Sequence, residues 1–272
     1  MGSGIAQVSA QSGFQTILYD LDPDVLQKAA THLEKSLQSL VEKGKLAFAE
    51  KNAIQQRLQF TSLLQDCIAD IFIEAIAEKP ELKIELFNQL DGMNNSKGIF
   101  ATNTSSLSVN NIASQIKNPE RLIGMHFFNP APVMKLVEVV NTNYTNEKTT
   151  RMIIDLAGQM GKTAVICNDS PGFIVNRVAR PYYIEALRLA EEKLSDFTQT
   201  DTLLEATGFR MGPFKLMDLI GNDINYAVSC SVYEQLNRPE RLKPSAIQKE
   251  KVEKGELGRK SGKGHYSYTP IS

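Results

Sequence analysis

Residues 2–20, GSGIAQVSAQSGFQTILYD, decide the fold of this chain. The stretch opens with small residues and continues with apolar residues at helical spacing, which is typical of a helix that packs on a sheet. It then passes into a β-branched run that ends at Asp20, which predicts a strand. A helix that leads directly into a strand is part of a repeating βα arrangement, so the chain is predicted to contain a parallel sheet covered by helices.

The same stretch matches the later part of a dinucleotide-binding motif. In that motif the third glycine of G-x-G-x-x-G lies on the first helix, and an acidic residue about 20 positions further on accepts the ribose 2′-hydroxyl. Gly2 and Asp20 have a compatible spacing. The first strand and the first two glycines would precede Met1, so we expect the domain to be truncated and the neighbouring strands to lack a ladder partner. The alternatives are a flexible tip at Gly2 and a solvated or helix-capping Asp20.

Short strands alternate with helices as far as about residue 168. Two helical patterns, 23–44 and 47–58, form an inserted helical hairpin. The other predicted helices are 80–93, 109–116 and 146–160, and the other predicted strands are 71–73, 98–101, 122–128, 136–140 and 163–167. From Ser170 onward only helical patterns occur, at 173–192, 198–206, 214–236 and 246–254. We therefore predict an α/β domain over residues 1–169 and an all-α domain over residues 170–272.

Composition excludes several classes of protein. The chain of 272 residues has 30 Lys and Arg against 31 Asp and Glu, a net charge of −1 that gives no overall attraction to nucleic acid or to an anionic membrane. The 3 cysteines are far apart, as in reduced intracellular proteins, and with only 3 histidines we expect no metal site. No apolar run reaches the length of a membrane span and no secretory signal is present, so we expect a cytoplasmic protein.

His126 and Glu138 lie inside two apolar runs, 122–128 and 136–140. A carboxylate flanked by Val137 and Val139 is costly to bury without a partner, and His126 on the adjacent predicted strand is the nearest candidate. A carboxylate paired with an imidazole orients the ring and fixes its tautomer, as a general base requires. The alternative is a hydrogen-bonded core histidine and an edge-strand charge.

Two further groups of polar residues lie where ligands bind. Residues 103–106, Asn-Thr-Ser-Ser, follow a predicted strand at the carboxyl end, the edge at which α/β sheets contact ligands, although taken alone these residues favour a plain N-cap of the helix from Val109 onward. Asn176 and Arg177 open the first helix of the second domain, and would matter if that helix faced the site.

Six segments of the chain carry a family resemblance. They are 2–7 (GSGIAQ), 103–107 (NTSSL), 124–139 (GMHFFNPAPVMKLVEV), 169–177 (DSPGFIVNR), 211–214 (MGPF) and 258–264 (GRKSGKG). In this order, and over essentially the whole chain, they resemble the L-3-hydroxyacyl-CoA dehydrogenase family, especially its monofunctional 3-hydroxybutyryl-CoA dehydrogenases. The resemblance implies a Rossmann-like NAD-binding domain and an all-α domain that forms a homodimer, with the active site between the domains.

The resemblance also implies roles for individual residues. His126 corresponds to the catalytic base, Glu138 to its partner, and Ser105 and Asn176 to the groups that bind the substrate's 3-oxygen. The expected coenzyme A contacts are Ser36 and Lys43. The expected NAD contacts are Gly2, Asp20, Glu74, Lys79, Ser105, Asn129 and Lys260.

The chemistry implied is the reversible oxidation of a short-chain L-3-hydroxyacyl-CoA, with NAD as acceptor and the acyl-CoA as the small-molecule partner. His126 takes the proton of the 3-hydroxyl group and Glu138 stabilises the resulting imidazolium. Asp20 favours NAD over NADP because a carboxylate repels a 2′-phosphate. Two alternatives stay open: a dehydrogenase of a free hydroxy or sugar acid, against which Ser36 and Lys43 argue, and a non-catalytic crystallin-like relative.

Overall fold

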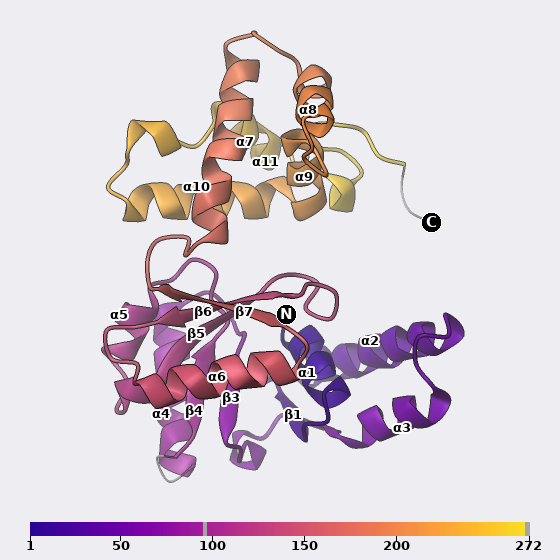
Figure 1. Ribbon diagram of the computed structural model, residues 1–272, viewed down its shortest axis with the longest axis vertical. Coiled ribbons are helices and arrows are strands. Elements are labelled where there is room, and N and C mark those ends of the chain that lie inside the picture. The colour runs from indigo at the N-terminus through magenta and orange to yellow at the C-terminus, as the bar shows by residue number, and fades with distance from the viewer. Residues whose placement is uncertain (95–96, 270–272) are drawn as a thin grey trace. The chain divides into compact units, whose positions relative to one another are not determined.

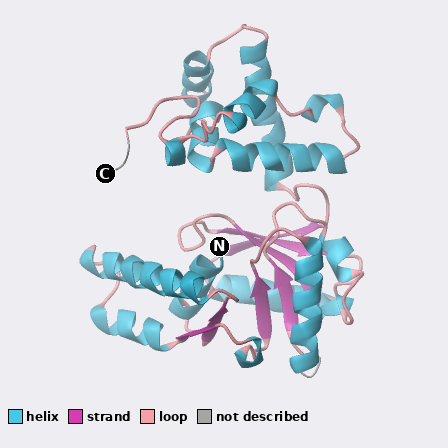
Figure 2. Ribbon diagram, turned by 180° about the vertical axis from the view of Figure 1, so that it is seen from behind, coloured by secondary structure: helices cyan, strands magenta, loops and turns pink. Residues whose placement is uncertain are grey.

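The computed structural model describes residues 1–94 and 97–269, which divide into two compact units, Met1–Asp169 and Ser170–Ser272. The first unit contains helices and strands in alternation and the second contains helices (Figures 1 and 2). The fold is therefore the predicted Rossmann-like α/β unit followed by a helical unit. Within the described residues, no helix is long and apolar enough to span a membrane, and no three His, Cys, Asp or Glu side chains cluster as metal ligands would.

The first unit has two sheets. Its strands are β1 (Thr16–Tyr19), β2 (Leu58–Thr61), β3 (Ile71–Glu74), β4 (Ile99–Thr102), β5 (Leu122–Phe127), β6 (Leu136–Asn141) and β7 (Thr163–Asn168). β1 pairs in parallel with β2, and β3 to β7 form a five-stranded sheet in sequence order. In the described part of the chain no ladder joins β1 to β3.

The larger sheet contains one antiparallel pairing, between β5 and β6. β6 is antiparallel to β5 and parallel to β7, whereas β3, β4 and β5 are mutually parallel. The parallel sheet predicted from the βα alternation is present in β3, β4 and β5, and the pairing of β6 with β5 is the one exception among the described pairings of this sheet. The reason is the short connection of residues 128–135, which is long enough for an antiparallel return but too short for a parallel crossover.

Helices cover both faces of this sheet. They are α1 (Gly2–Gln11), α4 (Pro80–Met93), α5 (Val109–Ala113) and α6 (Glu147–Gln159). Ile5 and Val8 of α1 share one apolar core with Ile153 of α6 and with Met125 of β5. On the other face, Phe87 of α4 lies with its ring 5.4 Å from that of Phe100. Because side chains alternate along a strand, the neighbours of Met125 in β5 point to this second face.

The inserted hairpin consists of α2 (Pro23–Glu42) and α3 (Phe48–Gln56). α2 begins with Asp22, whose carboxylate accepts the N–H of Asp24, and with a proline at the first helical position. Leu37 and Ile54 pack the two helices against Ala10 of α1. The sequence prediction extended the second helix to Leu58, but Leu58–Thr61 is strand β2, because its residues pair with β1 along their whole length.

The second unit contains α7 (Val175–Glu191), α8 (Phe197–Ala206), α9 (Pro213–Ile220), α10 (Asn222–Gln235) and α11 (Ala246–Glu253). The predicted single helix over 214–236 is divided at Gly221, whose φ of +105° is incompatible with a right-handed helix. Tyr183, Leu187, Phe214 and Met217 form the main core of this unit.

Candidate active site

The centre of the candidate site is a pair of facing side chains on β5 and β6. His126 and Glu138 are directly opposite each other in the antiparallel ladder. The Nδ1 atom of His126 is 2.7 Å from Oε2 of Glu138, and the two residues are 5% and 1% exposed. The sequence prediction of this pair from two apolar runs thus describes a real contact. A buried carboxylate beside an imidazole orients the ring and fixes which nitrogen carries the hydrogen.

An aromatic ring and a cysteine thiol lie close to the pair. The Phe128 ring centroid is 4.7 Å from that of His126. On the far side of Glu138, β7 brings Cys167 close, and burial, with the charges of Glu138 and Asp169, raises the pKa of the Cys167 thiol to about 11. Cys167 is therefore a neutral thiol at physiological pH and does not compete with His126 as a base.

The loop after β4 lies beside the end of β5. Oδ1 of Asn103 accepts the N–H of Phe127 at 2.8 Å, and the N–H of Asn103 is donated to the carbonyl of Glu74 at 2.8 Å. These bonds place Ser105, two residues further on, at the carboxyl edge of the parallel strands near the strand that carries His126. The helix that follows has its own N-cap, Ser108, so residues 103–106 are not simply a cap.

Glu78, which the sequence analysis did not single out, holds this loop. Its Oε1 atom accepts the hydroxyl of Thr104 at 2.5 Å, the N–H of Ser105 at 3.1 Å, and both the N–H and the hydroxyl of Ser106 at 3.2 and 3.0 Å. Although burial alone would raise it, the pKa of Glu78 is lowered by the Thr104 hydrogen bond and by the charge of Lys83. A single glutamate in a polar loop gives no periodic signal, so only its position after a strand could have drawn attention to it.

Glu74, an expected NAD contact, has different surroundings. Its carboxylate is 2.6 Å from the ammonium group of Lys83 and accepts the Thr102 hydroxyl at 2.7 Å and the Ile76 N–H at 2.7 Å. The side chains of Glu74 and Lys83 are both 1% exposed. Glu74 is thus engaged within the protein, whereas the exposed Lys79 begins α4. A direct NAD contact of Glu74 and Lys79 stays a prediction.

Three other expected cofactor contacts of the first unit, Gly2, Asp20 and Asn129, lie on different parts of it. Gly2 begins α1 close to β1, since a Cβ atom there would lie 3.7 Å from Cδ1 of Leu18. Asp20 follows β1, and its Oδ1 accepts the N–H of Asp22 at 3.0 Å. Asn129 lies exposed in the connection between β5 and β6, before the cis bond to Pro130.

These positions suit NAD. No side chain caps the N-terminus of α1 and its first turn has no acidic residue, so its N–H groups suit an anionic phosphate. Asp20 at the end of the adjacent strand offers a carboxylate acceptor for a ribose hydroxyl. Ser36 lies in α2, and Lys43, the other expected coenzyme A contact, is the exposed residue that caps the C-terminus of this helix.

Two expected site residues belong to the second unit. Asn176 lies in the first turn of α7, and its carbonyl accepts a hydrogen bond from Arg180 at 2.9 Å. Lys260 lies in a short 3-10 turn, Arg259–Ser261, and its ammonium group is 2.7 Å from Asp223. These contacts of Asn176 and Lys260 are formed within the second unit.

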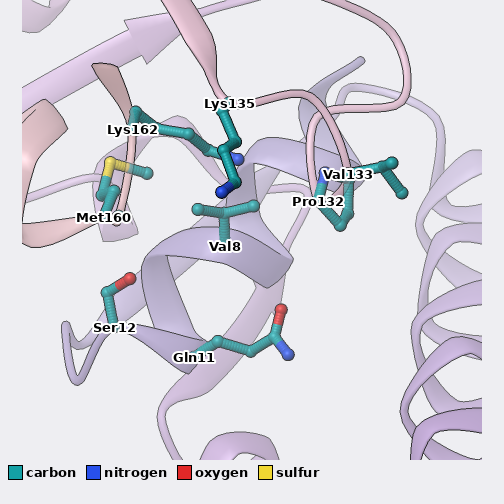
Figure 3. A pocket seen from close by; sticks show the side chains of 9 residues that line it. Val8, Gln11, Ser12, Pro132, Val133, Lys135, Met160 and Lys162 are labelled. Atoms are coloured by element: carbon teal, nitrogen blue, oxygen red, sulfur yellow. The ribbon is translucent and has the colours of Figure 1, made fainter. Parts of the chain in front are cut away.

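A surface pocket of about 310 Å³ lies at the edge of the first unit (Figure 3). None of the expected catalytic or cofactor residues lines it. Within it, the ammonium group of Lys162 donates to the carbonyls of Ala131 and Met134, at 2.6 and 2.9 Å, in the connection that follows Asn129. The pocket is lined by Val8, Gln11, Ser12, Pro132, Val133, Lys135, Met160, Gly161 and Lys162.

Comparison with known proteins agrees with this geometry. Residues 1–170 match the 3-hydroxyacyl-CoA dehydrogenase NAD binding domain, and residues 172–268 match the 3-hydroxyacyl-CoA dehydrogenase C-terminal domain. The chain is 45% identical to 3-hydroxyadipyl-CoA dehydrogenase of Escherichia coli (strain K12) over 98% of its own length and 57% of that protein.

Two solved structures are similar throughout. A 3-hydroxybutyryl-CoA dehydrogenase from Escherichia coli has a TM-score of 0.96 at 45% identity, and covers 98% of this chain, which spans 57% of that one. An (S)-3-hydroxybutyryl-CoA dehydrogenase from Ralstonia eutropha has a TM-score of 0.94 at 35% identity, with 99% and 95% of the two chains covered. This chain therefore belongs to the 3-hydroxyacyl-CoA dehydrogenases, a family of oxidoreductases that use NAD as cofactor.

Proposed function

We propose that this protein catalyses the reversible oxidation of a short-chain L-3-hydroxyacyl-CoA to the 3-ketoacyl-CoA, with His126 as general base. The observation that carries the proposal is the buried contact of 2.7 Å between His126 and Glu138. Similar proteins that bear the names of 3-hydroxybutyryl-CoA and 3-hydroxyadipyl-CoA dehydrogenases support a short acyl chain.

Glu138 sets the chemistry of His126. With Nδ1 directed at the carboxylate, the neutral ring carries its hydrogen on Nδ1 and its basic lone pair on Nε2. Nε2 takes the proton of the substrate's 3-hydroxyl group, and the positive charge that forms on the ring is stabilised by Glu138 in a site with little water. In the reverse direction the imidazolium returns this proton to the 3-oxygen.

Residues of both units bind the reactants in this proposal. NAD is held by the N-terminus of α1, which begins at Gly2, and by Asp20, Ser105 and Asn129. When bound, it accepts the hydrogen and electron pair from C3. Lys260 of the second unit contributes a positive charge. Ser105 and Asn176 donate hydrogen bonds to the 3-oxygen, where negative charge develops.

Ser36 and Lys43 bind coenzyme A, which distinguishes the reaction from oxidation of a free hydroxy acid. Lys43 is exposed near the end of α2, where an ammonium group can meet a phosphate. Charge reversal at Lys43 should therefore raise KM for an acyl-CoA and leave KM for NAD unchanged.

Two properties of the whole protein complete the proposal. The second unit exposes large apolar side chains, among them Leu203 of α8 at 65%, Ile224 of α10 at 50% and Phe209, between α8 and α9, at 51%, which supports a homodimer formed through this unit. We also propose a cytoplasmic location, in keeping with the three free cysteines and the absence of a membrane-spanning helix from the described residues.

The test compares the His126→Gln and Glu138→Gln variants with the wild type. Loss of the general base should lower kcat by about 10²- to 10⁴-fold, and Glu138→Gln should lower it less while the protein still binds NADH. The measurement is the fall in NADH absorbance as acetoacetyl-CoA is reduced. The exposed His32 gives a matched control, His32→Gln, which should retain full activity. Undiminished turnover by His126→Gln would contradict the proposal.

A further inference from the structure

Arg180 of α7 is a buried cation without a carboxylate partner. The residue is 3% exposed. Its Nε donates to the carbonyl of Asn176 at 2.9 Å, and its Nη1 donates to the carbonyl of Asn225 at 3.0 Å and to the hydroxyl of Ser229 at 2.8 Å. All these acceptors are neutral, and the guanidinium also lies 5.0 Å from the Tyr183 ring. Among the described residues no Asp or Glu forms an ion pair with it.

The position of this cation is energetically costly. Burial lowers the pKa of Arg180 to about 10, which still leaves the group charged at neutral pH. A buried charge that lacks an opposite charge is unfavourable, and hydrogen bonds to neutral oxygens offset only part of this cost. The planar guanidinium is suited to a carboxylate, which it binds through two parallel N–H bonds.

A buried donor with no acceptor among the described residues lies on the helix that Arg180 contacts. Nδ2 of Asn225 is buried and finds no hydrogen-bond partner in the described part of the chain. The orientation of this amide is fixed, because its Oδ1 atom accepts the Nε2–H of Gln248 at 3.1 Å. Arg180 binds the backbone carbonyl of this same Asn225. The region where α7 meets α10 thus has an excess of donors and one positive charge, which an anionic oxygen acceptor would satisfy.

The distance of Arg180 from the reacting carbon is also suitable. Arg180 follows Asn176 by four residues, so the two lie on one face of α7, about 6 Å apart along its axis. In a six-carbon 3-hydroxy diacid, three carbon–carbon bonds of about 1.5 Å each separate C3 from the terminal carboxyl carbon. A substrate whose 3-oxygen is bound by Asn176 can therefore extend its tail towards Arg180.

We propose that Arg180, with Nδ2 of Asn225, binds a terminal carboxylate of the acyl chain, and that the preferred substrate is the coenzyme A thioester of a 3-hydroxy dicarboxylic acid. This inference rests on the proposed function, in particular on the contact of Asn176 with the 3-oxygen. Arg180 is then a specificity-determining residue: it makes no contact with the reacting atoms, but provides a counter-charge that an uncharged acyl tail leaves unused.

The wild-type enzyme provides the first test. The kcat/KM values for 3-hydroxyadipyl-CoA and 3-hydroxyhexanoyl-CoA, which have the same chain length, are compared at neutral pH. A charge-assisted contact should favour the dicarboxylic substrate by about 10- to 100-fold. Turnover of both substrates with equal kcat/KM, or with preference for the uncharged one, would overturn this inference and leave the proposed function intact. Turnover of neither thioester would overturn both.

Variants assign the preference to the residue. Arg180→Met should reduce the ratio of the two kcat/KM values to about 1, and Arg180→Lys should restore part of it because the charge is kept. Asn225→Asp replaces the unpaired Nδ2 donor with a carboxylate oxygen and should reduce the ratio in the same way. The matched control is Arg188→Gln, at a partly exposed arginine of the same helix that lies near Glu185, and it should leave the ratio unchanged. A wild-type ratio in Arg180→Met or Asn225→Asp would exclude the role of this cluster.

Discussion

Glu74 and Glu78 are four residues apart but have different environments. The Glu74 carboxylate is buried with Lys83 and Thr102 at the end of β3, and Glu78 is partly exposed and bound to the loop of Ser105. The Lys83 ammonium group lies 2.6 Å from Glu74 and 3.2 Å from Glu78, so it connects the two. From these contacts we infer that Glu74 stabilises the fold, whereas Glu78 positions the loop that carries a substrate-binding hydroxyl.

Glu74→Leu should destabilise the protein strongly. The change leaves the buried Lys83 without its closest counter-charge, and leaves the Thr102 hydroxyl and the Ile76 N–H without their acceptor. Breaking a buried pair in this way costs about 3–5 kcal/mol. Urea denaturation followed by circular dichroism measures the free energy of unfolding. The same change at the exposed Glu85 of α4 is the control; a loss no larger than that of Glu85→Leu would show that Glu74 is not structural.

Sequence reasoning identified the residues whose surroundings conflict with their polarity. His126 and Glu138 were predictable because charged groups in apolar strands need partners, and the ladder places them opposite each other. Glu78 and Arg180 were not, because their roles depend on contacts with residues 26 and 45 positions away, which no local pattern encodes. The family resemblance supplied Asn176 and Lys260, for which the sequence alone gave no physical reason.

Among the elements, the connection between β5 and β6 accepts two hydrogen bonds from one lysine side chain. Lys162, at the turn before β7, donates to two carbonyls of this connection, and Figure 3 shows it beside Lys135 in the pocket. Partial burial lowers the pKa of Lys162. Because Asn129 lies at the start of the connection, Lys162 is expected to affect the cofactor site indirectly.

Lys162→Met should loosen this connection. Loss of two hydrogen bonds from a charged donor should lower stability by about 1–3 kcal/mol and increase the dissociation constant for NADH, while Lys162→Arg should recover part of both. Fluorescence titration with NADH and thermal denaturation are the measurements. Lys135→Met, in the same pocket, is the control, because Lys135 forms no ion pair within the described residues. NADH affinity equal to that of the control would refute the indirect effect.

The boundaries of helices and strands could be predicted from the sequence where the local signals, such as a proline at a helix start, were strong. Pro80–Met93 agrees with the predicted range, since a proline opens the helix and the apolar pattern continues to its end. Leu58–Thr61 and the break at Gly221 were missed for a physical reason: a four-residue strand has too few residues to show alternation, and a glycine within an apolar run shows its positive φ only in the folded chain.

At the scale of the whole molecule, the second unit depends on a buried carboxylate that joins its last segment to α9. Asp218 accepts hydrogen bonds from the backbone of His265 and Tyr266 and from the Tyr268 hydroxyl. Its approach to the chain is so close that a Cβ atom on Gly264 would lie 2.2 Å from its Oδ1. This contact explains physically why the segment 258–264 is rich in glycine. Although burial alone would raise it, the pKa of Asp218 is lowered to about 2 by its hydrogen bonds from His265 and Tyr266.

The stability of the second unit should therefore fall with acid in a defined range. The pKa of Asp218 is depressed in the folded state, so its contribution is complete above the ordinary aspartate value of about 4 and is lost as the pH falls towards about 2. Asp218→Asn should remove this pH dependence and lower stability at neutral pH. Thermal denaturation between these pH values measures it, with Asp155→Asn, an exposed aspartate of the first unit, as control. An acid response of Asp218→Asn identical to that of the wild type would contradict the assignment.

The boundary after Asp169 has a consequence for how such enzymes diversify. Asp169 is fixed to the first unit, because its carboxylate accepts the Ser108 hydroxyl and the Asn110 N–H. His126 and Glu138, the proposed proton-transfer pair, lie before this boundary and the proposed carboxylate-binding cluster lies after it. Recombination between relatives at this point would exchange acyl-chain preference while the inherited catalytic pair stays untouched. The same junction is the natural place to build chimaeras with chosen substrate ranges.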